Sequence, residues 1–434
     1  MTQFLSTAPY KGTRDFLPAE MSVRTQVFSK LYAVIESYGF ERYDGPLLEP
    51  VELYEAKSGS ELVNEQLFTL TDQGGRRLAL RPEMTPSVAR MIAANAPQLA
   101  FPARWYSHPN CHRYERPQKG RVREHWQINV DIFGSESLEA EVEIFELIHD
   151  MLGALGAQPT QYEIRANDRV LANSALRTYA RVPEELLGKV MRVLDRWEKY
   201  PREVVLKQLA ELGLDPASIT ACEELTTKDF AGICAAAAPD DVAKSRLARI
   251  LNSGMTDATL RFDPLIVRGL DYYTSTVFEV FDTNPENRRS IFGGGRYDNL
   301  TALFSKQRIP GIGFGMGDVT LMDFLSGHGL APAANAAAQV VVLPLSASTR
   351  TALKEAAARL RRAGLRVTTP HEESGLGKDL KKADKHGAKV AVIIGEEELT
   401  RGKLVVRDLA RSTQREVARE DITATVLAML EHKD

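Results

Sequence analysis

A stretch from about Arg169 to Ala258 separates two strand-rich regions of this chain. It is rich in Ala, Leu, Lys and Glu at helical spacing and contains no clear strand. Strands are expected before it, at Gln161–Arg165, and again after it, at Arg261–Arg268 and Thr276–Phe281. The pattern therefore predicts an α+β fold in which one β-rich domain is discontinuous in the sequence and carries a helical insertion.

The length of 434 residues exceeds one ordinary hydrophobic core and indicates two or three domains. A segment rich in Ala, Gly and Pro marks a linker near the C-terminal third. Apolar strands then alternate with helices, which is typical of a small α/β domain with a mostly parallel sheet. The expected division is a discontinuous core over 1–168 and 259–326, a helical insertion over 169–258, a linker over 327–338 and a C-terminal domain over 339–434.

A basic, turn-containing segment connects two apolar stretches between Arg113 and Gly134. Its cations are Arg113, Arg116, Lys119, Arg121 and Arg123. Guanidinium groups match phosphate oxygens two at a time and stay charged at physiological pH, so this loop predicts a phosphate-binding role. On charge alone, the alternative is a surface hairpin with scattered cations.

The strand that follows this loop alternates polar and apolar residues. Gln127, Asn129 and Asp131 occupy every second position between Ile and Val. A polar face on an apolar strand is unfavourable unless it lines a site. The sequence therefore predicts a strand, a phosphate-binding loop and a second strand that forms the floor of a ligand site.

Other segments add candidate residues. Glu83 and Thr85 follow the second strand of a predicted hairpin, where ligand contacts often lie. Arg268 leaves an apolar segment and enters a polar turn, a position where arginine is usually paired or contacts a ligand. Glycines in Phe292–Asp298 and Gly311–Gly317 permit close backbone approach to a flat ligand, although close crossing by a helix would also explain the second run.

Composition limits the function classes. The chain has 55 basic and 58 acidic residues, so nucleic-acid binding would use local patches rather than a global positive field. Cys111, Cys222 and Cys234 are widely spaced and match no metal or disulfide pattern, which fits a reducing compartment, and no metal-ligating residues are expected. No apolar run of about 18 residues and no leader-like N-terminus occur, so we expect a soluble cytoplasmic protein without membrane contact.

Together these segments resemble the histidyl-tRNA synthetase family of class II aminoacyl-tRNA synthetases. The resemblance extends from Lys11 to about residue 425. The segment 113–134 resembles the class II motif 2 loop, and Arg268–Tyr273 and Gly293–Asp298 resemble the two histidine signatures of the family. The C-terminal segment resembles its anticodon-binding domain. The implied fold is an antiparallel class II catalytic core with an insertion, followed by an α/β anticodon-binding domain.

The resemblance implies the reaction and its partners: histidine is activated by ATP, with Mg²⁺, and transferred to tRNA(His) by a cytoplasmic homodimer. By position, Arg113 would hold the α-phosphate and Arg268 its opposite side. Arg121 and Glu115 would bind ATP, with Arg121 at the outer phosphates. Two buried partners for the imidazole nitrogens would reject similar-sized amino acids, because an impostor leaves those partners unpaired.

The resemblance also implies which residues bind histidine. Glu83, Thr85 and Gln127 match the positions that hold the substrate ammonium, and Asp131 and Tyr273 match those that face the imidazole. Tyr272 and Arg268 complete the expected histidine-binding set.

One position departs from the family pattern. Class II motif 3 usually carries an arginine that contacts the γ-phosphate, and Thr320 stands at that place. No Arg or Lys occurs between Arg308 and Arg350, so the cation has not moved along this segment. We expect Arg121 to hold the outer phosphates instead, helped by Arg123 or magnesium.

Two alternatives belong to other function classes. The regulatory subunit of ATP phosphoribosyltransferase resembles the same core, senses histidine without catalysis and lacks the anticodon-binding domain. The second alternative is a tRNA-binding module without catalytic activity, which would require that the motif 3 change abolishes catalysis. Lys378, Lys381, Lys382 and Lys385 are candidate tRNA contacts, with a solvated helix face as the alternative.

Overall fold

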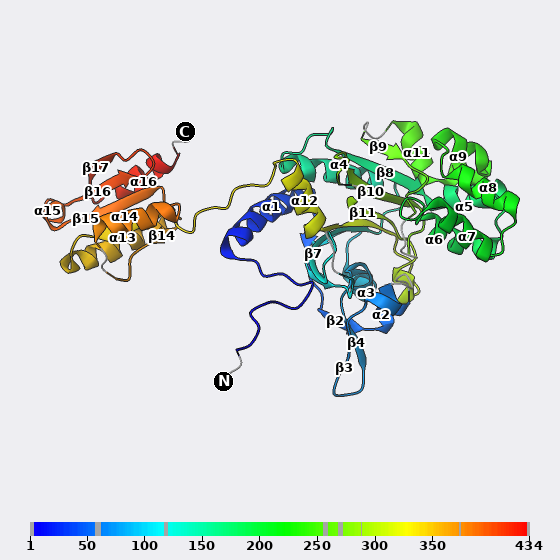
Figure 1. Cartoon of the computed structure of the whole chain (residues 1–434), viewed down its shortest axis with the longest axis horizontal. Helices are drawn as coiled ribbons and strands as arrows, with labels where there is room; N and C mark the ends of the chain where they lie inside the picture. The colour runs from blue at the N-terminus through cyan, green and yellow to red at the C-terminus, as the bar shows by residue number, and fades with distance from the viewer. Residues whose placement is uncertain are drawn as a thin grey trace. The chain divides into compact units, whose positions relative to one another are not determined.

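The structure is a computed structural model (Figure 1) that describes residues 4–56, 62–116, 120–254, 259–267, 272–287, 289–372 and 375–431. Contacts divide the chain into two compact units, Met1–Asp15 with Gln26–Ala331 and Phe16–Thr25 with Pro332–Asp434. Arg268, Lys119 and Arg288 lie outside the described residues. In the described parts of the chain, no helix is long and apolar enough to cross a membrane.

A mixed sheet forms the centre of the larger unit, and its described strands number nine. In spatial order they are β1 (Glu41–Arg42), β5 (Ala103–Ser107), β7 (Glu124–Phe133), β12 (Gly311–Gly317), β11 (Ser290–Arg296), β10 (Thr276–Asp282), β8 (Tyr162–Asp168) and β9 (Leu260–Phe262), with β6 (Asn110–His112) also on β7. The strands from β5 to β8 pair antiparallel, whereas β1 and β9 add parallel edges. The expected α+β class with an antiparallel core is confirmed.

Helices α1 (Pro18–Ser37), α4 (Glu139–Ala154) and α12 (Asp318–Gly327) lie beside this sheet (Figure 1). Their apolar side chains belong to the same core cluster as those of the sheet. Leu31 of α1 and Ile144 of α4 are fully buried in the same core as Val130 of β7. Because successive strand residues point to opposite faces, this packing turns the polar residues of β7 away from the helices. The alternation that the sequence predicts for this strand is thus observed.

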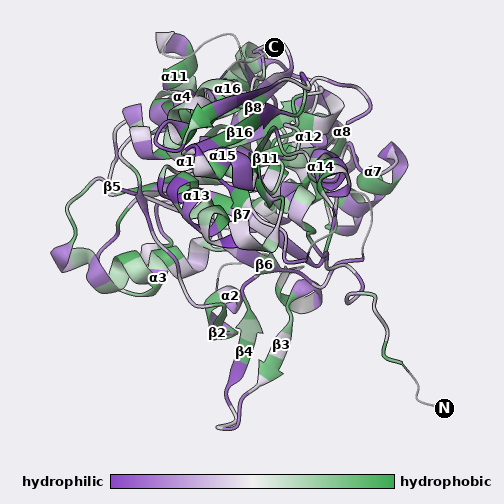
Figure 2. Cartoon of the chain, turned by 90° about the vertical axis from the view of Figure 1, so that its left-hand side faces the viewer, coloured by the Kyte–Doolittle hydropathy of each residue, from purple (hydrophilic) through white to green (hydrophobic). Residues whose placement is uncertain are grey.

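A second, three-stranded sheet precedes the motif 2 segment. It pairs β2 (Leu48–Pro50), β4 (Arg77–Leu80) and β3 (Thr69–Thr71), and Figure 2 shows β3 and β4 as a hairpin that extends from the larger unit. Short helix α2 (Glu52–Glu55) and helix α3 (Thr85–Asn95) flank it. Thr85 is the first residue of α3, so Glu83 and Thr85 lie between a strand and a helix, as the sequence predicts.

Between residues 169 and 254 the described residues form helices and their connections, with no strand. The helices are α5 (Arg169–Thr178), α6 (Leu187–Leu194), α7 (Arg202–Glu211), α8 (Pro216–Leu225), α9 (Phe230–Ala236), α10 (Pro239–Lys244) and α11 (Arg246–Ser253). Local capping fixes several starts: Asp168 accepts from the Val170 amide at 2.8 Å, and Ser245 accepts from Ala248 at 3.1 Å. These helices share an apolar cluster that includes Leu171 and Leu209 and extends to Val267.

The smaller unit contains a five-stranded sheet in the order β14 (Val367–Thr368), β13 (Val340–Pro344), β15 (Val390–Ile394), β16 (Lys403–Asp408) and β17 (Gln414–Ala418). Its helices are α13 (Arg350–Arg362), α14 (Leu376–Lys385), α15 (Glu396–Thr400) and α16 (Ile422–Glu431). Single-turn 3-10 or π segments elsewhere cover Leu62–Gln66, Ala96–Gln98, Glu184–Leu186, Thr301–Leu303 and Ala347–Thr349.

Two expected details are wrong. The C-terminal sheet is not mostly parallel, because β16 and β17 pair antiparallel. The connection between β15 and β16 is too short for a crossover, which needs about a dozen residues. The strand expected over Arg261–Arg268 ends at Phe262, since Pro264 cannot donate to a sheet ladder.

Candidate active site

The floor of the site is the polar face of β7, and glycines on β12 make room for it. Gly313 pairs with Asp131 and Gly315 with Asn129. A Cβ atom on Gly313 would lie 2.3 Å from Asp131 Oδ1, and one on Gly315 would lie 1.8 Å from Gln127 Nε2. The glycines of this strand therefore create space for the polar side chains of its neighbour.

Asp131 lies at the buried end of this floor. It is 3% exposed, and the hydroxyl of Tyr297 donates a hydrogen bond to its Oδ1 atom. Burial raises the pKa of Asp131 to about 7, because a carboxylate loses hydration there. Tyr297 was not among the sequence-predicted site residues. Its place in the Gly293–Asp298 signature was the available signal.

Glu83 and Tyr272 form the opposite wall. The Tyr272 hydroxyl donates to Glu83 Oε2 at 2.8 Å, and both side chains are buried. Burial, followed by the negative charge of Glu83, raises the pKa of Tyr272 well above its usual value. The neighbouring Tyr273 ring lies 4.8 Å from that of Tyr272, centroid to centroid.

These walls enclose a cavity of about 190 Å³. Seven of the expected site residues line it: Glu83, Thr85, Arg113, Gln127, Asp131, Tyr272 and Tyr273. We call it the inner pocket. Its size and its convergent polar groups suit a small polar ligand.

A larger cavity of about 1520 Å³, which we call the outer cavity, adjoins the inner pocket. Arg113, His125, Ser290 and Gly317 line both. Arg113 is held by a bond from its Nε to the Pro82 carbonyl at 2.9 Å. Glu115 and Arg121 line the outer cavity only, with 3.6 Å between the Glu115 carboxylate and Arg121 Nε.

His125 was missed at the sequence level. It lies on β7 where the two cavities meet, and burial, reinforced by the charge of Arg113, lowers its pKa to about 3. It is therefore a neutral imidazole at physiological pH. Its position two residues before Gln127 in the alternating pattern was the only sequence signal.

Arg123 does not line either cavity. Its guanidinium lies 4.3 Å from the centre of the Tyr114 ring and 5.2 Å from that of Tyr10. It also donates from Nε to the Glu115 carbonyl at 3.2 Å, and its amide donates to the Gly12 carbonyl at 2.7 Å. The expected help from Arg123 at the phosphates has no support in this geometry, because the N-terminal segment engages this side chain.

Thr320 lines the outer cavity in the first turn of α12. Its hydroxyl donates to the Ile291 carbonyl of β11 at 2.5 Å. The start of this helix is tied further by Asp318, which accepts from Arg14 at 2.9 Å and from the Trp126 amide at 3.1 Å. The motif 3 position thus contributes a helix-to-strand contact.

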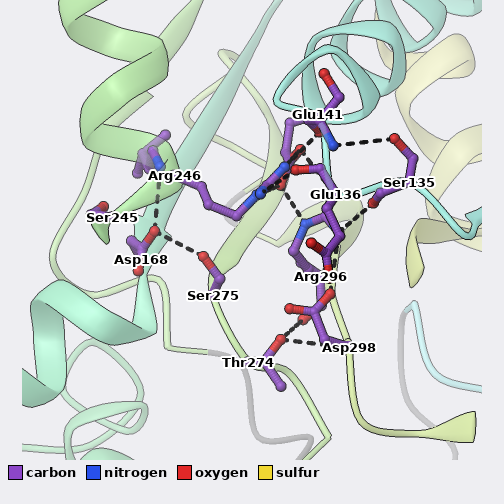
Figure 3. Close-up of polar contacts among 12 residues, drawn as sticks. Ser135, Glu136, Glu141, Asp168, Ser245, Arg246, Thr274, Ser275, Arg296 and Asp298 are labelled. Atoms are coloured by element: carbon purple, nitrogen blue, oxygen red, sulfur yellow. Dashed lines mark hydrogen bonds and ion pairs between the residues drawn. The ribbon is translucent and has the colours of Figure 1, made fainter. Parts of the chain in front are cut away.

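The second histidine signature also supports the scaffold (Figure 3). Arg296 is 1% exposed and points toward Glu141 of α4. Arg246 of α11 donates to the same carboxylate, with 2.7 Å between its Nη2 atom and Glu141 Oε2. Glu141 therefore joins the signature strand to an insertion helix.

Among the described residues, no group of three or more His, Cys, Asp or Glu side chains is arranged to hold an ion. Glu115 does place one carboxylate in the outer cavity. One or two carboxylates together with substrate phosphates are the usual ligands of Mg²⁺, so this side chain fits an ion that arrives with a nucleotide.

Family comparisons agree with this architecture. The model described as histidyl-tRNA synthetase matches residues 12–321, and that of the anticodon binding domain matches residues 339–429. The chain belongs to the histidyl-tRNA synthetase family. The second match is the feature that disfavours the regulatory-subunit alternative, because the resemblance implies that such subunits lack this domain.

Curated relatives of this synthetase family extend over almost the whole chain. A histidine–tRNA ligase of Leptospira biflexa is 39% identical over 417 residues, which covers 95% of both chains. One from Thermoplasma volcanium is 38% identical over 418 residues, covering 95% of this chain and 96% of the other. The family activity is therefore that of an aminoacyl-tRNA ligase.

Solved structures of the family share the fold. A histidyl-tRNA synthetase from Nostoc sp. PCC 7120 has a TM-score of 0.80 at 25% identity and covers 98% of this chain and 100% of its own. The apo enzyme of S. aureus has a TM-score of 0.73 at 20% identity, covering 97% of this chain and 100% of its own. The latter similarity concerns the fold alone.

Proposed function

We propose that this chain is a histidine–tRNA ligase with a complete two-step reaction. The carboxylate of histidine attacks the α-phosphorus of ATP, the bond to the β-phosphate breaks, and pyrophosphate leaves. A terminal ribose hydroxyl of tRNA(His) then attacks the carbonyl of the adenylate, and AMP leaves. Such chemistry is catalysed mainly by positioning and by stabilising developing charge.

The observation that carries the proposal is the position of Arg113 at the junction of the two cavities. A ligand that fills the inner pocket and a polyphosphate in the outer cavity would meet beside this guanidinium. The hydrogen bond from Arg113 Nε to the Pro82 carbonyl, 2.9 Å long, holds the guanidinium group in this position. Arg113 is thus suited to the α-phosphate, where charge develops in the transition state.

Histidine recognition is assigned to the inner pocket. Glu83, Thr85 and Gln127 would receive the ammonium, because acceptor oxygens from two segments converge there. Asp131 and Tyr273 would face the imidazole, and Tyr272 would hold the Glu83 carboxylate in place through its 2.8 Å bond. These assignments use polar partners that an apolar side chain could not satisfy.

The outer phosphates are assigned to Arg121 and Glu115 in the outer cavity. Glu115 would hold Mg²⁺, which neutralises phosphate charge when it is bound. Arg268 would approach the α-phosphate from the side opposite Arg113; this residue lies outside the described part of the chain.

The remaining assignments concern the whole molecule. We assign a discontinuous catalytic core to 1–168 and 259–326, an insertion to 169–258, a linker to 327–338 and an anticodon-binding domain to 339–434. We also assign a cytoplasmic homodimer. Exposed Leu47 and Leu48, next to Pro46, support an apolar contact between copies.

Histidine-dependent exchange of pyrophosphate into ATP tests the proposal directly. Wild-type protein should exchange and should charge tRNA(His). Arg268→Ala should keep its melting temperature and lose nearly all exchange, because the lost cation acts on the transition state. Wild-type protein that binds histidine without exchanging pyrophosphate would instead be a sensor or binder.

A further inference from the structure

Another arginine reaches the outer cavity from a segment with no assigned role. Arg289 lies immediately before β11 and lines this cavity together with Arg113 and Arg121. A Cβ atom on Gly120 would lie 2.9 Å from Arg289 Nη1, so the guanidinium lies against the motif 2 loop next to Arg121. Two separate segments therefore bring cations to one place.

Strand β11, which follows Arg289, also contacts Thr320, the residue at the motif 3 arginine position. Thr320 donates to the carbonyl of Ile291, two residues after Arg289, and both Thr320 and Arg289 line the outer cavity. The helix that lacks the usual arginine is thus bound to a strand whose first flanking residue is an arginine.

The arginines beside the motif 2 loop suit an anion. Two carboxylates elsewhere in the cavity lining have side-chain partners of their own: Glu163 pairs with Arg165 at 2.5 Å, and Asp282 lies 2.8 Å from His328 Nε2. Glu115 lies beside these arginines, with 3.6 Å between its Oε2 atom and Arg121 Nε. Convergent guanidinium groups repel one another and are best compensated by a polyanion such as a polyphosphate.

We propose that Arg289 is a further ATP-binding residue, which contacts the β- or γ-phosphate in place of the motif 3 arginine. This inference rests on the proposed ligase function and adds a residue to its ATP site. The cation is supplied by the start of β11 rather than by α12, and Arg121 approaches the same phosphates from the motif 2 loop.

The test is Arg289→Ala in the full-length protein, with histidine-dependent pyrophosphate exchange as the assay. The KM for ATP should rise about tenfold or more, as expected for the loss of a charge-assisted hydrogen bond, while the KM for histidine changes little. The matched control is Arg261→Ala, an exposed cation that lines the same cavity and pairs with Glu163 at 3.8 Å. It should leave both constants near those of wild type.

A second readout separates a phosphate contact from a general lesion. The sulfamoyl analogue of histidyl-adenylate has no outer phosphates, so Arg289→Ala should bind it as wild type does. Weaker analogue binding in step with the change for ATP would overturn the assignment. An unchanged KM for ATP in an active enzyme would also overturn it, whereas inactive wild type would count against the ligase function itself.

A second substitution that rescues Arg289→Ala provides an independent test. Thr320→Arg restores a cation on α12, so in the Arg289→Ala background it should lower the KM for ATP toward the wild-type value. If the double variant folds with an unchanged melting temperature and its KM stays raised, the two positions do not serve the same phosphates.

Discussion

Arg296 and Glu141 are fully buried and meet through two parallel hydrogen bonds, 2.5 Å from Nε to Oε1 and 2.9 Å from Nη2 to Oε2. We expect Arg296→Ala to lower the free energy of unfolding by about 3–5 kcal/mol, because it leaves a buried carboxylate with one fewer partner. Urea unfolding measures this. Arg308→Ala removes an exposed partner of Asp298 at 3.3 Å and should change stability by about 0–1 kcal/mol.

Asp131 should give the free enzyme a pH-dependent stability. Burial raises its pKa from 3.8 to about 7, so between these values the folded protein holds a proton that the unfolded chain has released. Its contribution is complete below pH 3.8 and is lost as the pH rises through about 7. Wild type should therefore lose stability relative to Asp131→Asn across this range. Parallel stability–pH curves for the two proteins would contradict the assignment.

Tyr273→Phe should raise the KM for histidine about 5- to 150-fold, which corresponds to about 1–3 kcal/mol for a buried group left without its partner. The KM for ATP should change little, since Tyr273 lines the inner pocket and not the outer cavity. Steady-state exchange kinetics distinguish the two constants. A histidine complex in which the imidazole points away from both Tyr273 and Asp131 would refute the assignment.

Gly315→Ala should abolish histidine binding while the protein still folds. The new Cβ atom would lie 1.8 Å from Gln127 Nε2, so the Gln127 side chain must leave its place on the floor of the pocket. Gly153→Ala is the matched control, because nothing lies within 4 Å of its Cβ position in α4. It should keep affinity and gain up to about 1 kcal/mol of stability. Isothermal titration with histidine compares them.

Replacement of Lys378, Lys381, Lys382 and Lys385 by Ala should weaken tRNA binding and leave pyrophosphate exchange unchanged. These residues lie on α14 in the smaller unit. Each lost phosphate contact should reduce the slope of log affinity against log salt by about one. Filter binding across a salt series provides the measurement, and an unchanged slope would favour a solvated helix face.

Sequence patterns predicted the parts of the fold that depend on local periodicity. The alternation around Asp131 identified both the strand and its polar face, and composition predicted the helices that follow Arg169. The antiparallel pairing of β16 with β15 was not predicted, because pairing direction depends on connection length and on tertiary packing.

The site was predictable where a residue belongs to a motif and less so where its role depends on distant contacts. Tyr297 and Arg296 are adjacent, yet one faces Asp131 and the other faces Glu141. The role of Arg289 required the spatial neighbour Gly120, which lies far away in the sequence. Arg123 looked like a phosphate ligand until its contact with Tyr10 was known.

The contact with Arg123 places the N-terminal segment against the end of the motif 2 loop. Gly12 accepts the amide of Arg123, and Arg14 holds the start of α12 through Asp318. An affinity tag fused close to this end, or proteolytic trimming through residue 14, would therefore act like a mutation of the nucleotide site. Protein for kinetic work should carry any tag at the C-terminus.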